Sequence, residues 1–459
     1  MLSHFRSTRG LVADSLGTRS LESRRVEISM MIAIGLAALV LVFQIQWSWL
    51  SDDALMLEWS AANGPHGGSV VSFLNLWLRG WSSRIAIGGA WFIFVNHLVW
   101  WRILTALAYW LVIVLPAFLI GRNRVQRQML IPVSALLLLS IPTVVWFDAG
   151  LVATTANYLW VLAAGMLAAL PAVFYFQRRS FSPLWYVVTI LSGFYAASFE
   201  IGAPILFAIY AFMLGRGLYL HRNSARNVEV TNRGQIAAFS LFALLFLAMV
   251  IWHLTSPGNA ARGMGSWFGP MFGILVERSY SSTLRQIFMS RYLIPLTFFV
   301  LVAWRNYRKS GWSPLTFISL APIAGSLLLR DAHFPGLMGE RINSLFRGGN
   351  LLWDTTGPEI LHTAFPLNLA AILLLTIMLA AVIIAIWGAL GWGSELWILL
   401  AILGAGFASK FIVVNTLGLA LDNDFHRTDL FLLYAFVFAI LVLLTDDGSH
   451  RKLSPPQDH

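Results

Sequence analysis

Cysteine is absent from this sequence, and only 11% of its residues are charged. Without cysteine the chain has no disulfide bond, no cysteine-ligated zinc ion and no thiol nucleophile. The sequence also lacks a Walker-type nucleotide loop, an HExxH motif and a GxSxG motif, and its histidines do not show metal-ligand spacing. These absences argue against ATP-driven transport, a zinc hydrolase and a serine hydrolase of the common types.

What the chain has instead is apolar surface. Hydrophobic residues make up 58% of the 459 positions, with 20 Trp and 32 Phe. Soluble domains carry about 25% charged residues, more than twice the share found here. The composition therefore predicts an all-α polytopic membrane protein, with aromatic rings at the membrane interface and between helices.

We expect about twelve spanning segments, within a range of about ten to thirteen. They lie near residues 28–50, 101–121, 129–146, 157–176, 183–199, 201–219, 235–254, 289–304, 313–329, 366–387, 395–414 and 429–445. Residues 1–27 then form a basic N-terminal tail, residues 28–447 the membrane domain, and residues 448–459 a C-terminal tail.

Lysine and arginine set the expected orientation. If both termini lie inside, 19 of the 31 Lys and Arg residues fall in the inside segments, as the positive-inside rule requires. The net charge of +10 then reflects topology, so we expect membrane lipid and not nucleic acid as the partner. The first outer loop, residues 51–100, interleaves Trp with Arg79 and Arg84, and Arg102 follows at the start of the second span; this pattern predicts one or two interfacial helices.

Two adjacent carboxylates, Asp52 and Asp53, follow the first apolar run with only Ser51 between. They can simply mark the point where a helix meets water. At headgroup depth, however, partial desolvation raises a carboxyl pKa toward the range of a general base. The pair could also hold a divalent cation that bridges to a phosphate, and Arg79 and Arg84 in the same loop could bind that phosphate.

Two further stretches place polar groups beside membrane segments. Asp148 follows the third predicted span, and Asn157 and Tyr158 begin the fourth. They are typical of an aromatic belt at a turn, or of a site where a sugar ring stacks and forms hydrogen bonds. Glu200 lies between two apolar runs, and a glutamate inside a bilayer is a functional candidate by default; in an outside turn it would be an ordinary solvated residue.

The later outer loops add cations. Pro257, Gly258 and Asn259 predict a turn, and its amides together with Arg262 could form an anion site. Arg341 is a candidate for a lipid-linked phosphate, although a solvated loop explains each of these residues equally well. Lys410 lies within an apolar run, where an ammonium group is costly unless it pairs or reaches the surface.

A family resemblance rests on these stretches. The acidic pair after the first span, the long first outer loop and about a dozen spans resemble the GT-C class of membrane glycosyltransferases. SDD at 51–53, WLRGWSSR at 77–84, ANYLW at 156–160, SFE at 198–200 and SPGNAAR at 256–262 are similar to a set of multispanning bacterial proteins grouped with that class. The resemblance covers roughly residues 28–265.

The resemblance implies a bacterial plasma-membrane enzyme that transfers a sugar from a polyprenyl-phosphate donor to a cell-envelope glycan at the outer face. It implies Asp52 or Asp53 as the base and metal ligand for Mg²⁺ or Mn²⁺, with Arg84, Asn259 and Arg262 on the donor phosphate. The alternative is a transporter or lipid-linked glycan flippase that uses Glu200, Lys410 and Asp148 as an intramembrane charge path.

Overall fold

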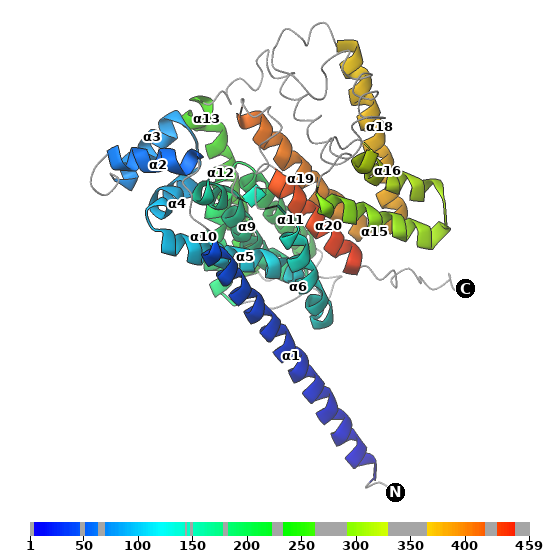
Figure 1. Ribbon diagram of the computed structural model, residues 1–459. Coiled ribbons are helices and arrows are strands. Elements are labelled where there is room, and N and C mark those ends of the chain that lie inside the picture. Colours follow the sequence, from blue (N-terminus) through cyan, green and yellow to red (C-terminus); the bar gives the residue numbers. More distant parts are fainter. Residues whose placement is uncertain are drawn as a thin grey trace. The chain divides into compact units, whose positions relative to one another are not determined.

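The computed structural model describes residues 4–45, 51–62, 69–142, 145–146, 150–177, 182–222, 233–261, 292–328, 365–417 and 429–445 (Figure 1). Within these ranges all regular secondary structure is helical, which confirms the all-α prediction. Asp148, Arg262 and Arg341, three of the predicted site residues, lie outside the described residues.

Among the described residues, five helical stretches are long and apolar enough to cross a membrane, namely Ser23–Gln44, Leu98–Ile120, Leu151–Phe176, Gly202–Arg222 and Gly234–Thr255. Six shorter apolar helices accompany them, at Ile85–Val95, Leu184–Ala197, Pro314–Gly325, Thr376–Leu390, Glu395–Ser409 and Leu430–Thr445. The chain is therefore a helical, membrane-embedded, multi-pass protein, and the number of spans stays a prediction.

The chain divides into two compact units. The first comprises residues 1–74, 84–138 and 149–252, and the second comprises residues 75–83, 139–148 and 253–459. The first unit holds most of the predicted site residues, so its helices are described first.

In the first unit, α1 (His4–Gln44) runs through the predicted tail and into the first span without a break (Figure 1). It packs on α5 (Leu98–Ile120), where Trp110 Nε1 donates to the Met31 carbonyl at 2.8 Å. Glu27 of α1 is buried and accepts from Arg127 Nε at 2.7 Å, and Arg124 lies 3.3 Å away. Both arginines belong to α6 (Arg124–Leu139), so one acid fixes the start of the first span to the next connection.

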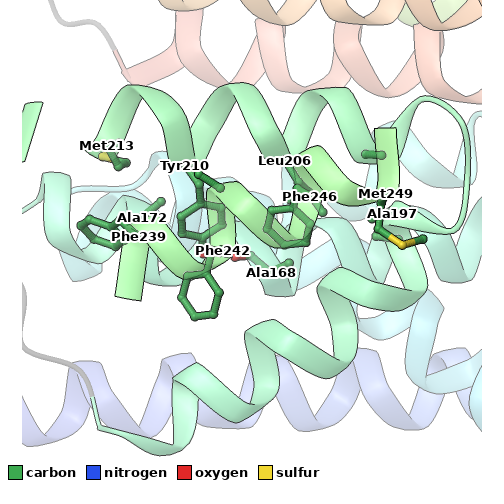
Figure 2. Close-up of a cluster of buried hydrophobic side chains, with 13 residues drawn as sticks. Ala168, Ala172, Ala197, Leu206, Tyr210, Met213, Phe239, Phe242, Phe246 and Met249 are labelled. Carbon is green, nitrogen blue, oxygen red and sulfur yellow. Dashed lines mark hydrogen bonds between the residues drawn. The ribbon is translucent and has the colours of Figure 1, made fainter. Parts of the chain in front are cut away.

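The core of the first unit lies among α9 (Trp160–Phe176), α10 (Leu184–Ala197), α11 (Gly202–Arg222) and α12 (Arg233–Thr255). Figure 2 shows Tyr210 of α11 among Phe239, Phe242 and Phe246 of α12, with ring centroids 5.9, 5.0 and 5.6 Å apart. Alanines of α9 and α10 complete the cluster, because small residues let those two helices approach closely. The Tyr210 hydroxyl donates to the Ala168 carbonyl at 2.5 Å, which satisfies the one polar atom of its ring.

The segment predicted as the first outer loop contains three short helices within its described residues, α2 (Ser51–Ala62), α3 (Val70–Gly80) and α4 (Ile85–Val95). Phe73 of α3 stacks on Phe92 of α4 at 4.9 Å, and Trp59 of α2 contacts both rings edge-on. Their location at a membrane interface stays a prediction.

The second unit contains α13 (Pro257–Ala261), α15 (Leu293–Ser310), α16 (Pro314–Leu328), α18 (Phe365–Leu390), α19 (Ser394–Leu417) and α20 (Leu430–Thr445). Asn306 of α15 joins three of these helices, because its Nδ2 donates to Ser319 Oγ of α16 and to the Ala385 carbonyl of α18. Tyr292, just before α15, donates its hydroxyl to Asp429 at 2.9 Å. Lys410 lies within α19.

Candidate functional site

Asp53 anchors α2 to the start of the apolar helix Leu151–Phe176. The side chain is fully buried, and it accepts three hydrogen bonds. Trp91 Nε1 and the Ala153 amide donate to Oδ1 at 3.0 and 2.9 Å, and the Val152 amide donates to Oδ2 at 2.9 Å. Val152 and Ala153 belong to α8 (Leu151–Thr154), the first turn of the apolar helix Leu151–Phe176. A carboxylate at this position satisfies the orphan amides of a helix N-terminus and faces the positive end of its dipole.

Gly150 makes this approach possible. Its backbone has φ +134 and ψ 157, a region that only glycine adopts without strain. A Cβ at this position would lie 2.7 Å from Asp53 Cγ and 2.8 Å from Oδ2. The glycine is therefore required both by its conformation and by the close contact with the carboxyl group.

Opposing effects act on the ionisation of Asp53. Burial raises the pKa of its carboxyl group above the ordinary value of 3.8, since the charged form loses water. The hydrogen bonds donated by the Val152 and Ala153 amides and by the Trp91 indole lower the pKa, but burial has the larger effect. The pKa is raised, as the sequence predicts, but by burial of Asp53 against α4 and α8; desolvation at headgroup depth stays a prediction.

A π-helical turn, η1 (Thr155–Leu159), interrupts this helix one turn below Asp53. Thr155 Oγ1 donates to the Leu151 carbonyl at 2.6 Å and accepts from Trp101 Nε1 at 2.8 Å. Asn157 Nδ2 donates to the Ala153 carbonyl at 2.8 Å. The side chains of Thr155 and Asn157 thus donate hydrogen bonds to backbone carbonyls of the preceding turn. π-Helical turns within α-helices occur often at functional sites.

Arg84, at the N-terminus of α4, forms a buried ion pair with Glu200. Its Nε lies 2.8 Å from Glu200 Oε2 and 3.0 Å from Oε1, and its Nη1 donates to Asn157 Oδ1 at 2.9 Å. The guanidinium carbon lies 4.3 Å from the centroid of the Phe199 ring. Arg84 and Glu200 are 7% and 8% exposed. A buried glutamate needs such a partner, because an isolated carboxylate in an apolar medium is very costly.

These contacts form one continuous chain of hydrogen bonds. Asp53 accepts from the Ala153 amide, the Ala153 carbonyl accepts from Asn157, and Asn157 accepts from Arg84, which pairs with Glu200. Four residues predicted separately from sequence therefore lie in one network. It joins α2 and the start of α4 to the ends of two apolar helices, Leu151–Phe176 and Gly202–Arg222.

A second polar cluster lies in the second unit. Ser83 Oγ is 2.5 Å from His253 Nδ1, and Asn259 Nδ2 donates to Ser83 Oγ and to the His253 carbonyl, each at 2.8 Å. Asn259 Oδ1 accepts from the Ser83 amide at 3.1 Å. All three side chains are buried, and a Cβ on Gly258 would lie 2.6 Å from the Leu78 carbonyl oxygen. The segment predicted as a turn is the short helix α13, and Asn259 holds it against the α3–α4 connection instead of presenting an open anion site.

The other predicted residues that the structure describes, Asp52, Arg79 and Tyr158, differ in how deeply they are buried. Asp52 of α2 is partly exposed, and Arg79 of α3 is exposed. Tyr158 is buried, with its ring 5.7 Å from that of Phe199, so it packs in the core of the site and does not present a stacking surface for a sugar. Sequence reasoning missed Trp91, Ser83 and His253. Trp91 lies within an apolar run and His253 near the end of one, so only the polar ring nitrogens of these two residues in apolar surroundings could have signalled them.

The residues around Asp53 do not fit a divalent cation. Both carboxyl oxygens already face N–H donors, whose positive ends would repel a metal ion. Among the residues that the structure describes, no group of three His, Asp or Glu side chains is arranged to hold a metal. Mg²⁺ or Mn²⁺ at Asp52 and Asp53 stays a prediction from sequence, and no chemical step is assigned to it here.

Comparisons with family models, with curated proteins and with solved structures found no match to this chain.

Proposed function

We propose that this chain is a membrane glycosyltransferase that moves a sugar from a polyprenyl-phosphate donor to a cell-envelope glycan at the outer face of the bacterial plasma membrane. The GT-C architecture of about twelve spans and the placement of both termini inside belong to the same proposal. The observation that carries it is the hydrogen-bonded network from Asp53 through Asn157 to Arg84 and Glu200. It links carboxylates and a cation at the ends of membrane helices, where a lipid-linked donor presents its phosphate.

The two carboxylates take different roles in this proposal. Asp53 has all three of its hydrogen bonds directed at the Trp91 indole and the start of the Leu151–Phe176 helix, so it fixes the loop. Asp52, the next residue on α2, is partly exposed and can meet a substrate. Asp52 accepts the proton of the acceptor hydroxyl. The hydroxyl oxygen forms a bond to the anomeric carbon, and the bond to phosphate breaks with its electron pair on the polyprenyl phosphate.

Arg84 is the proposed contact for the donor phosphate. Its guanidinium is held by Glu200 and Asn157 and lies against Phe199, so its orientation is fixed before substrate binds. A donor phosphate would share this cation with Glu200, and a charge that is already held in place stabilises a leaving phosphate with little reorganisation.

The test is turnover of a lipid-linked sugar by the purified chain in lipid nanodiscs. Polyprenyl phosphate carrying labelled glucose, mannose or arabinose is supplied with envelope glycan, and label transfer and polyprenyl phosphate release are measured. The wild-type chain should use at least one donor. Asp52→Asn should lower the rate about 10²–10⁴-fold, the usual contribution of a general base.

Glu58→Gln is the matched control, since Glu58 is an exposed acid on the same helix; it should keep the wild-type rate. Normal transfer by both Asp52→Asn and Asp53→Asn would contradict the catalytic assignment, and failure to use any donor would contradict the proposed reaction. The transporter alternative gains no specific support, because Glu200 is paired with Arg84 and Asp148 lies outside the described residues.

A further inference from the structure

An apolar groove runs between α11 and α12, with a volume of about 470 Å³. Its lining includes Phe207, Ala211, Gly215 and Leu218 of α11 and Ser240 and Leu244 of α12. Both helices are long and apolar enough to cross a membrane, so the groove opens at the depth of lipid chains.

The aromatic core explains why the groove exists. Tyr210 and the phenylalanines of α12 fill the space between the two helices (Figure 2). Groove residues Phe207, Ala211 and Leu218 each follow by one position a core residue of α11 (Leu206, Tyr210 and Gly217), so they lie on the neighbouring face, about 100° around the helix. The rings hold the backbones apart, and small residues on this second face leave the space open.

Gly215 is the residue that opens the groove. A Cβ at this position would meet no heavy atom within 4 Å, apart from its own helix backbone and chain neighbours. The one hydroxyl in the lining, on Ser240, already donates to the Ile236 carbonyl at 2.9 Å. The lining therefore needs no hydrogen bond from a ligand, as expected for a groove that binds a hydrocarbon chain.

Basic groups lie where the groove reaches the end of α11. His221 and Arg222 lie three and four residues after Leu218, which places them on the same helix face. Arg222 is exposed, and His221 Nδ1 is buried without a hydrogen-bond partner among the described residues. Basic pockets between membrane helices bind anionic lipid headgroups. We propose that this groove binds an anionic glycerophospholipid, with an acyl chain along Gly215 and the phosphate headgroup at His221 and Arg222.

The test counts lipids on the purified full-length chain by native mass spectrometry. Phosphatidylglycerol and phosphatidylcholine with identical acyl chains are added in equal amounts to the wild-type chain and to three variants. The wild-type chain should retain phosphatidylglycerol in preference. Gly215→Leu fills the groove and should remove the bound lipid, whatever its headgroup.

Gly404→Leu is the matched control, since Gly404 is an exposed glycine of the apolar helix α19 with equally open space around its Cβ position. It should retain the lipid. Arg222→Gln leaves the groove intact and should reduce the preference for phosphatidylglycerol about fivefold, which corresponds to about 1 kcal/mol for one basic side chain at a lipid surface.

Two results would overturn this inference: equal retention of the two lipids by the wild-type chain, or wild-type phosphatidylglycerol binding by Gly215→Leu. A third arm adds polyprenyl phosphate. If Gly215→Leu loses polyprenyl phosphate and keeps phosphatidylglycerol, the groove serves the lipid-linked donor and the assignment to phospholipid is wrong. None of these measurements requires the chain to transfer sugar, so they stand apart from the proposed activity.

Discussion

Replacement of Asp53 by alanine should destabilise the fold far more than replacement of its neighbour Asp52. Asp53→Ala strands three donors in a buried environment, namely the amides of Val152 and Ala153 and the indole of Trp91. A buried donor that loses its partner costs about 1–3 kcal/mol, so the loss should total about 2–6 kcal/mol if water reaches one of the three donors and the other two stay unsatisfied. Asp52 is partly exposed, and Asp52→Ala should change stability by less than about 1 kcal/mol.

A double-mutant cycle with Gly150 makes the test specific to the contact. Gly150→Ala introduces backbone strain of about 1–3 kcal/mol at φ +134 and places a Cβ against the Asp53 carboxyl group. In the Asp53→Ala background the strain remains, but the steric conflict is gone. The double variant should therefore be more stable than the sum of the single effects predicts, by about 1–3 kcal/mol.

Thermal unfolding in detergent, followed by the fluorescence of the 20 Trp residues at one fixed scan rate, measures these differences. Asp53→Ala should unfold several degrees below Asp52→Ala. Equal midpoints for the two variants, or strict additivity of Asp53→Ala and Gly150→Ala, would refute the helix-cap role of Asp53.

Two further predictions concern the same network. Burial raises the pKa of Asp53, so the folded chain binds this proton more tightly than the unfolded chain. The stability of the fold should therefore fall as pH rises from about 3.8 through the raised pKa. The Asp53→Asn variant should lack this slope when unfolding is measured across the same pH window. Arg84→Met leaves Glu200 buried without its partner and should cost about 3–5 kcal/mol, whereas Arg84→Met combined with Glu200→Met should recover most of it. A pH slope that persists in Asp53→Asn, or a double variant less stable than Arg84→Met alone, would contradict these two expectations in turn.

The class of the fold follows from the sequence, because long apolar runs can only be membrane helices. The number of spans does not. Several helices, such as Leu184–Ala197 and Leu430–Thr445, are shorter than the about 20 residues that a straight span needs. Whether a short helix crosses depends on its tilt and its neighbours, which hydropathy does not encode.

The sequence identifies Asp53, Arg84, Asn157 and Glu200 as candidate site residues, but it does not show which of them bond to one another. The cost of a buried charge marks Glu200 as a residue that needs a partner, but Arg84 is 116 positions away and only the fold selects it. One motif predicts Asn157 and Tyr158 together as site residues. In the π-helical turn, however, Asn157 accepts a hydrogen bond from Arg84, whereas Tyr158 is buried against Phe199. The role of Gly150 depends on the approach of Asp53 from another segment, so no local pattern reveals it.

In the proposed function, the loop that contains Asp52 and Asp53 lies on the outer face of the membrane, where a lipid-linked donor can reach it. The natural absence of cysteine allows a direct test by single-cysteine labelling in cells that express the chain. Glu58→Cys, at an exposed position of α2, should react with a membrane-impermeant maleimide in intact cells, whereas Arg122→Cys, at an exposed position before α6, should react only after permeabilisation. Labelling of Arg122→Cys in intact cells together with protection of Glu58→Cys would put the carboxylates on the inner face and contradict the account.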